Sequence, residues 1–158
     1  TGSITNCSFI KNKITTYNFA CYGGAICCNG IFTGEVSNSI FSENSAVPIL
    51  PNKKHGYGGA FRCGEKFLGD ITNSVFIKNS AQNGGGISVG NVFSGKNDGF
   101  ADLGGTFFLK NEAKNFGGAI YCNGSVKMAA LSGDVVFQEN LFNNGQPCGC
   151  ILLTQKKT

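Results

Sequence analysis

The sequence contains no tryptophan, one methionine, three prolines and one histidine in 158 residues, and only 14% of the residues are charged. This low charge, with a hydrophobic share of 41%, excludes the class of highly charged disordered chains, so we expect one folded domain spanning residues 1–158. No hydrophobic run approaches the roughly 18 residues that predict a membrane-spanning helix. No basic run exceeds two residues, so the sequence predicts no nucleic-acid partner and no direct membrane binding. Because the chain starts at Thr1 without a signal-peptide pattern, we expect it to be a segment of a longer protein.

Glycine and phenylalanine are abundant, and they recur in a repeated pattern. The 24 glycines are about twice the usual share, and they accompany 14 phenylalanines. This composition favours strands joined by tight turns. The tetrapeptide Phe-x-x-Asn occurs five times at intervals of about 30 residues, and Gly-Gly-(Ala/Gly)-(Ile/Phe) follows the first four copies. Glycine pairs and the absence of a 3.6-residue hydrophobic period exclude helical repeats.

The two motifs supply most of the candidate functional residues. The Phe-x-x-Asn copies are Phe9 and Asn12, Phe41 and Asn44, Phe76 and Asn79, Phe108 and Asn111, and Phe137 and Asn140. The glycine motifs contain Gly23, Gly24, Ala25 and Ile26; Gly58, Gly59 and Ala60; Gly84 and Gly85; and Gly117, Gly118, Ala119 and Ile120.

The columns of the aligned repeats show which side chains face inward. After the glycines, two hydrophobic columns flank a mixed or polar column that contains Cys27, Arg62, Ser88 and Tyr121, as expected for strands with one buried face. Before each Phe, an Ile or Val column lies at a different parity from the Phe column. The strand must therefore bend near Asn6, Asn38 and Asn73.

These patterns predict an all-β fold, a right-handed single-stranded parallel β-helix of about five coils, with repeat units starting near residues 2, 34, 69, 101 and 133. The Phe side chains would form an internal ring stack. Each Asn of Phe-x-x-Asn would tolerate corner dihedrals and form a hydrogen-bonded ladder along the stack. The glycine pair would let the backbone turn with positive φ.

Three segments are longer than the repeat requires, and loops should project there: 13–22, 45–57 and 93–103. Insertions on a solenoid commonly carry binding, although loops without a partner are the alternative interpretation. The best candidate is 45–57, which combines Pro48 and Pro51 with basic and hydrophobic residues. The candidate binding residues there are Ile49, Leu50, Lys53, Lys54 and His55.

The paired motifs resemble those of the passenger domains of chlamydial polymorphic membrane proteins, over nearly the whole chain. The chain departs from that pattern at Gly-Gly-Ala-Phe and Gly-Gly-Gly-Ile. The resemblance implies an autotransporter whose β-helical passenger is displayed at the surface of a Gram-negative outer membrane, and whose only membrane contact is a barrel domain outside this segment. It also implies adhesion to a host-cell protein or glycan receptor, with both motifs implicated, and leaves self-association of passengers open.

The sequence predicts no enzyme and no catalytic, cofactor or metal site. Asp70, Asp98, Asp102 and Asp134 occur in different contexts and form no acidic cluster, and His55 lies in a Lys-rich insertion. No cysteine spacing is typical of zinc. A carbohydrate-active β-helix enzyme and a non-binding spacer within a longer passenger remain as alternatives to an adhesin.

The eight cysteines divide into an inward column and exposed candidates. Cys28, Cys63 and Cys122 share a column where burial is expected. The candidates for exposed redox chemistry are Cys7, Cys21, Cys27, Cys148 and Cys150, whose pairing the sequence does not predict.

Overall fold

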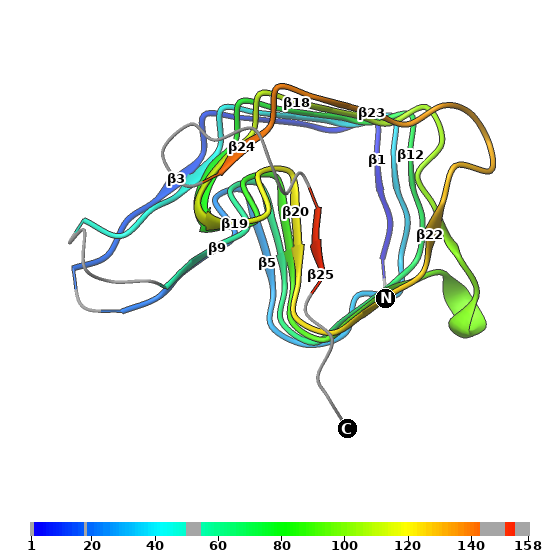
Figure 1. Cartoon of the computed structure of the whole chain (residues 1–158), viewed down its shortest axis with the longest axis horizontal. Helices are drawn as coiled ribbons and strands as arrows, with labels where there is room; N and C mark the ends of the chain where they lie inside the picture. The colour runs from blue at the N-terminus through cyan, green and yellow to red at the C-terminus, as the bar shows by residue number, and fades with distance from the viewer. Residues whose placement is uncertain (1, 18, 50–54, 143–150, 154–158) are drawn as a thin grey trace.

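The computed structural model describes residues 2–17, 19–49, 55–142 and 151–153. In Figure 1 successive coils lie behind one another, so that equivalent strands from each coil overlap along the stack. Every strand pair is parallel. The predicted all-β parallel β-helix is confirmed, and it makes about four complete turns. Within the described residues, the helical structure is one 3-10 turn, η1 (Lys96–Asp98), and no helix is long and hydrophobic enough to cross a membrane.

The Phe of each Phe-x-x-Asn motif lies in one five-stranded sheet, and the last residue of each glycine motif lies in a second five-stranded sheet. The first sheet contains β2 (Ser8–Ile10), β7 (Ile40–Ser42), β13 (Val75–Ile77), β18 (Phe107–Leu109) and β23 (Val136–Gln138). The second contains β5 (Ile26–Cys28), β10 (Phe61–Cys63), β15 (Ile87–Val89), β20 (Ile120–Cys122) and β25 (Ile151–Leu153).

A seven-stranded sheet connects these two sheets along the chain. It contains β3 (Lys13–Ile14), β8 (Ser45–Ala46), β14 (Ser80–Asn83), β19 (Glu112–Phe116) and β24 (Leu141–Phe142), together with β4 (Cys21–Tyr22) and β9 (Gly56–Tyr57). In the third coil the single strand β14 pairs with both β8 and β9.

Three short sheets complete the coils. The first contains β1 (Ile4–Thr5), β6 (Val36–Ser37) and β12 (Ile71–Thr72). The second contains β11 (Lys66–Leu68), β16 (Val92–Ser94) and β21 (Ser125–Val126). The third contains β17 (Ala101–Asp102) and β22 (Met128–Ala129). The first strand of the fifth coil is therefore β22, and residues 130–134, with a bend at 132–133, connect it to β23.

The Phe column of the motif forms the predicted internal ring stack. Consecutive ring centroids from Phe9 to Phe137 lie 4.9, 4.6, 5.0 and 4.9 Å apart, with interplanar angles of 9°, 3°, 10° and 6°. The three central rings, Phe41, Phe76 and Phe108, are fully buried. Parallel in-register pairing therefore places identical side chains on top of one another in the core.

The Asn column forms the predicted hydrogen-bonded ladder. In each step the side-chain amide donates to the Oδ1 of the next Asn at 2.9 Å, from Asn12 through Asn44, Asn79 and Asn111 to Asn140. The same Oδ1 also accepts the backbone N–H of the preceding Asn at 2.9–3.0 Å. The ladder therefore satisfies backbone donors at a corner where the chain leaves the sheet.

The structure corrects one part of the corner prediction. The motif Asn is not the residue with the left-handed backbone; the charged residue before it is, with φ of 52–57° at Lys11, Glu43, Lys78, Lys110 and Glu139. The bend predicted earlier in the coil is confirmed at Asn6, Asn38 and Asn73, where φ is 48–55°. In the fourth coil Gly105, with φ of 70°, replaces that Asn.

The two glycines of each pair have different roles. The first glycine has positive φ in all four copies, 60–68° at Gly23, Gly58 and Gly84 and 64° at Gly117. The second does not; at Gly85 an added Cβ would lie 2.2 Å from the carbonyl oxygen of Gly118 in the next coil. The first position is therefore glycine because of its backbone conformation, and the second because neighbouring coils approach too closely for a side chain.

The structure corrects the predictions for Cys21 and, in part, for Cys28. Cys21 was expected to be exposed, but it is fully buried, because it packs in a small cluster with Ala46 and Ala81, against which Ile14 also packs. Cys63 and Cys122 are fully buried as expected, and Cys27 is exposed. Cys28 was expected to be buried with them but has intermediate exposure, as has Cys7, whereas Cys148 and Cys150 lie outside the described residues.

Candidate functional site

The motif residues lie inside the coil rather than on its surface. The Asn side chains of the second to fifth coils are at most 2% exposed, and Ala60, Ala119 and Ile120 are fully buried. Members from the first coil, Phe9, Asn12 and Gly24–Ile26, are less covered because they lie at the end of the stack. No motif side chain of the central coils is therefore available to touch a partner, and an adhesive role of the motifs remains a prediction.

Two of the three predicted insertions form one feature, which we call the arm: residues 15–20 and 47–55 as far as they are described. The backbone N–H of Ile49 donates to the carbonyl of Thr16 at 3.0 Å, and that of Cys21 donates to the carbonyl of His55 at 2.8 Å. The two insertions thus stack as the coils do, and they project from the solenoid beside β3 and β9 (Figure 1). The third insertion carries η1 at a different edge.

The arm exposes hydrophobic side chains. Phe19 is 78% exposed, Tyr17 66% and Ile49 47%. His55 is also exposed, whereas the other predicted loop residues, Leu50, Lys53 and Lys54, lie outside the described residues. The sequence placed binding in 45–57, and the structure adds that 15–20 shares the same projection.

A second feature is a groove where β4 and β9 turn into the glycine-motif sheet. A column of rings from Tyr22, Tyr57 and Phe116 runs along the stack, but in the third coil its register partner is Asn83, which is buried. The adjacent column likewise has Ser88, also buried, between Arg62 and Tyr121. Two small polar residues therefore interrupt the aromatic surface at one coil.

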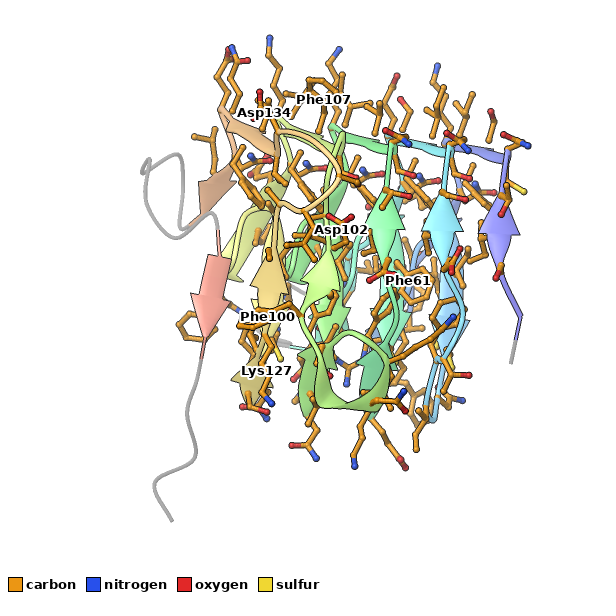
Figure 2. All side chains as sticks on the ribbon, turned by 90° about the vertical axis from the view of Figure 1, so that its right-hand side faces the viewer. Phe61, Phe100, Asp102, Phe107, Lys127 and Asp134 are labelled. Atoms are coloured by element: carbon orange, nitrogen blue, oxygen red, sulfur yellow. The ribbon has the colours of Figure 1, made fainter. Side chains whose placement is uncertain are left out.

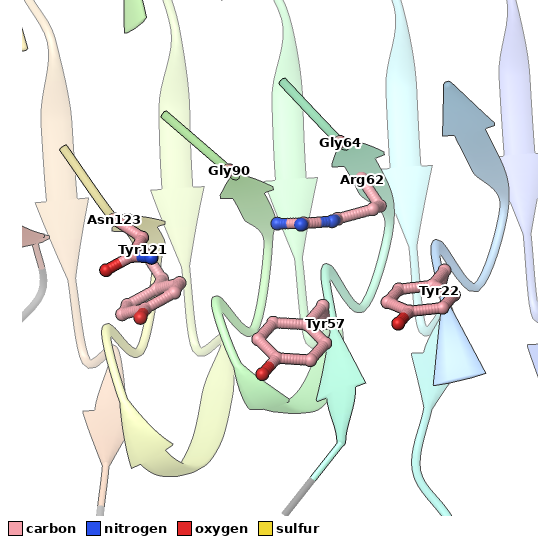
Figure 3. A pocket seen from close by; sticks show the side chains of 7 residues that line it. All are labelled: Tyr22, Tyr57, Arg62, Gly64, Gly90, Tyr121 and Asn123. Carbon is pink, nitrogen blue, oxygen red and sulfur yellow. The ribbon is translucent and has the colours of Figure 1, made fainter. Parts of the chain in front are cut away.

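The interruption produces a hollow of about 190 Å³, which we call the Arg62 hollow (Figure 3). It is lined by Tyr22, Tyr57, Arg62, Gly64, Gly90, Tyr121 and Asn123. In Figure 3 Tyr22, Tyr57 and Tyr121 lie in a row from coil to coil, and the Arg62 side chain extends toward the coil that carries Gly90. Gly64 and Gly90 have no side chain that would fill the hollow. A Cβ at Gly90 would lie 3.3 Å from a guanidinium nitrogen of Arg62.

Arg62 dominates the electrostatics of this hollow. Its guanidinium carbon lies 4.9 Å from the ring centroid of Tyr57 and 5.9 Å from that of Tyr22, and its Nη1 donates to Ser88 Oγ at 2.8 Å. Its Nε is buried and has no hydrogen-bond partner among the described residues. The ion pairs of the described residues join other side chains, so no carboxylate there neutralises Arg62. Burial lowers the pKa of Arg62, whereas nearby Tyr57 opposes the shift, and the group stays protonated at neutral pH.

Asp70 and Asp102 lie next to each other in neighbouring coils, although the sequence placed them in different contexts. Asp102 accepts backbone N–H groups of Gly104, Leu131 and Ser132, and Asp70 accepts that of Asp102 at 2.8 Å, so both stabilise turns. Although burial opposes it, these hydrogen bonds lower the pKa of Asp102. In Figure 2 Asp134 is drawn above Asp102, and its backbone carbonyl accepts the N–H of Gly105 at 3.0 Å. No group of three or more potential metal ligands occurs among the residues that the structure describes.

The architecture defines a repetitive parallel β-solenoid with internal Phe and Asn ladders and lateral projections. Residues 105–123 match the family model for the Chlamydia polymorphic membrane protein repeat. The chain therefore carries a repeat of the kind found in the passenger domains of these chlamydial surface proteins. No curated protein and no solved structure matches the chain.

Proposed function

We propose that this chain is a surface-displayed passenger segment that acts as an adhesin and contacts a host-cell receptor, a protein or a glycan, through its arm. The observation that carries the proposal is the arm itself. Two insertions from neighbouring coils stack on each other and expose Tyr17, Phe19 and Ile49, although the solenoid does not need these residues to close its core. Clustered exposed hydrophobic side chains are typical of protein interaction sites.

The repeat type supports display on the outer membrane of a Gram-negative bacterium. The burial of the motifs supports separate roles for the two parts of the chain. The Phe-x-x-Asn and Gly-Gly residues stabilise the stack of coils, and the projecting insertions bind the receptor. The contacts of Asp70 and Asp102 support a non-enzymatic role. Both carboxylates accept backbone N–H groups and so stabilise turns, whereas hydrolysis or elimination on a β-helix needs an acid and a base that face a substrate.

Attachment of coated beads to cultured epithelial cells tests the proposal. The double variant Tyr17→Ser/Phe19→Ser should reduce attachment of the 158-residue chain severalfold. The matched control is Phe100→Ser, since Phe100 is 62% exposed but lies on the η1 insertion (Figure 2) and not on the arm. Unchanged attachment of the arm variant would refute the arm as the contact, and failure of the unmodified chain to attach would favour a spacer.

A further inference from the structure

The Arg62 hollow is a second site on the chain, with a chemistry different from that of the arm. It combines aromatic faces with a cation that has no carboxylate partner among the described residues. We propose that the Arg62 hollow binds an acidic sugar, with the ring of the sugar against Tyr57 and Tyr121 and its carboxylate or sulfate on the Arg62 guanidinium. The proposal does not rest on the adhesive role of the arm.

The guanidinium is arranged for an additional anion. One of the five N–H groups of the Arg62 guanidinium donates to Ser88. Tyr22 and Tyr57 contact the guanidinium through their rings and leave its other N–H groups as donors. A half-buried cation without a counter-ion is costly, and a bound carboxylate or sulfate would supply charge-assisted, two-point hydrogen bonds in a partly desolvated place. An internal salt bridge would have met the same need, but the structure places none there among its described residues.

The rings favour a sugar over a simple ion. A pyranose has one apolar face that packs on an aromatic ring, and the hollow is lined by the rings of Tyr22, Tyr57 and Tyr121. A volume of about 190 Å³ is below the roughly 300–1,000 Å³ of pockets for drug-sized ligands. One sugar residue at the end or within a glycan fits this size better than a large ligand.

The position along the stack favours a chain-like ligand. The rings extend along the stack: Tyr22 lines the first-coil end of the hollow, and Phe116 lies beside Tyr121 in the fourth coil at 6.2 Å between centroids. Tyr22 and Tyr57 are stacked at 5.8 Å. Neighbouring sugar units could therefore lie on successive rings while the acidic unit occupies the interruption at the third coil.

Titration calorimetry with defined probes tests the proposal: 3′-sialyllactose, a sulfated heparin disaccharide, neutral lactose and a tri-glutamate peptide. We expect at least one acidic sugar to bind, more weakly as NaCl rises, and lactose and the peptide not to bind. A preference for sialyllactose would identify carboxylate as the anion, and a preference for the heparin disaccharide would identify sulfate. Equal binding of lactose, equal binding of the peptide, or no binding of either acidic sugar would overturn the proposal.

Variants locate the site. Arg62→Met should weaken binding of the acidic sugar about tenfold or more through loss of the charge-assisted hydrogen bonds. Lys78→Gln, which removes the same charge from an exposed corner, should have no effect. Full binding by folded Arg62→Met would refute the assignment. If Arg62→Met fails to fold, NMR of the unmodified chain tests the site instead. The ring resonances of Tyr57 and Tyr121 should shift when sialyllactose or the disaccharide is added. Unchanged resonances would overturn the proposal.

Discussion

The side-chain amide of Asn79 donates a hydrogen bond to Oδ1 of Asn111 at 2.9 Å, across two coils that are 32 residues apart in sequence. The same amide donates to the carbonyl of Phe41 in the coil on the other side, also at 2.9 Å. One buried side chain thus connects three consecutive coils. Because this arrangement recurs at Asn44 and Asn111, the repeat is held together by its polar corner as well as by its Phe stack.

Removal of Asn79 should destabilise the chain strongly. Asn79→Ala leaves the backbone N–H and side-chain amide of Asn44 without their acceptor, and each buried polar group left unsatisfied costs about 1–3 kcal/mol. Asn12→Ala is the matched control, because Asn12 occupies the same motif position but is exposed and contacts only the next coil. Urea denaturation should show a much larger loss of unfolding free energy for Asn79→Ala, and equal losses would contradict a structural role of the buried ladder.

The second glycine of the third pair should tolerate no side chain. In Gly85→Ala the new Cβ meets the carbonyl oxygen of Gly118 at 2.2 Å, so two coils must separate. Gly30→Ala introduces the same methyl group where no atom lies within 4 Å. Thermal melting should show a lower Tm for Gly85→Ala and little change for Gly30→Ala, whereas similar melting of both would mean that the coils are less tightly apposed.

Thiol labelling separates the cysteine columns. A brief reaction of the native chain with iodoacetamide, followed by peptide mapping, should modify Cys27 and leave Cys63 and Cys122 unmodified until the chain is unfolded. Cys21 should also be protected, because it packs against Ala46 and Ala81. Rapid modification of Cys63 in the native state would contradict the register of the glycine-motif sheet.

Stability should fall at alkaline pH. Burial raises the pKa of Cys63 and of Cys122 to about 11 from an ordinary value of 9.0. Between these values the folded chain holds protons that the unfolded chain releases, so the stabilisation is complete below pH 9 and is lost as pH rises toward 11. Denaturation midpoints measured across this range should decline less steeply for Cys63→Ala than for the unmodified chain, and identical slopes would mean that the thiol does not titrate with folding.

The repeated residues determine how much of the fold could be predicted from sequence. The Phe, Asn and glycine columns recur in register, so the ring stack, the ladder and the positive-φ glycines follow from them directly. The left-handed residue before each motif Asn could not be identified, because Lys and Glu carry no signal for that backbone conformation. The burial of Cys21 depends on its packing against Ala46 and Ala81 of the next two coils, which the repeated motifs do not encode.

The Arg62 hollow could be predicted only in part. The mixed column with Arg62 and Ser88 was visible in the aligned repeats as a departure from the hydrophobic columns beside it. The ring row was also available in the sequence, because Tyr22, Tyr57 and Phe116 each directly precede a glycine pair and Asn83 precedes the remaining one, but this column was not predicted to line a site. Local interruption of a regular column was therefore the available signal for a site.

The central claim is that the motifs build the coil and do not touch a partner. It is tested most directly by Phe76→Leu, which changes a fully buried ring of the stack but keeps a hydrophobic side chain that the core can accommodate. Cell attachment and far-UV circular dichroism should be measured at the same temperature, well below the Tm of this variant. The structure predicts a lower Tm with unchanged attachment of the folded variant, whereas a variant that melts like the unmodified chain and yet fails to attach would contradict the claim.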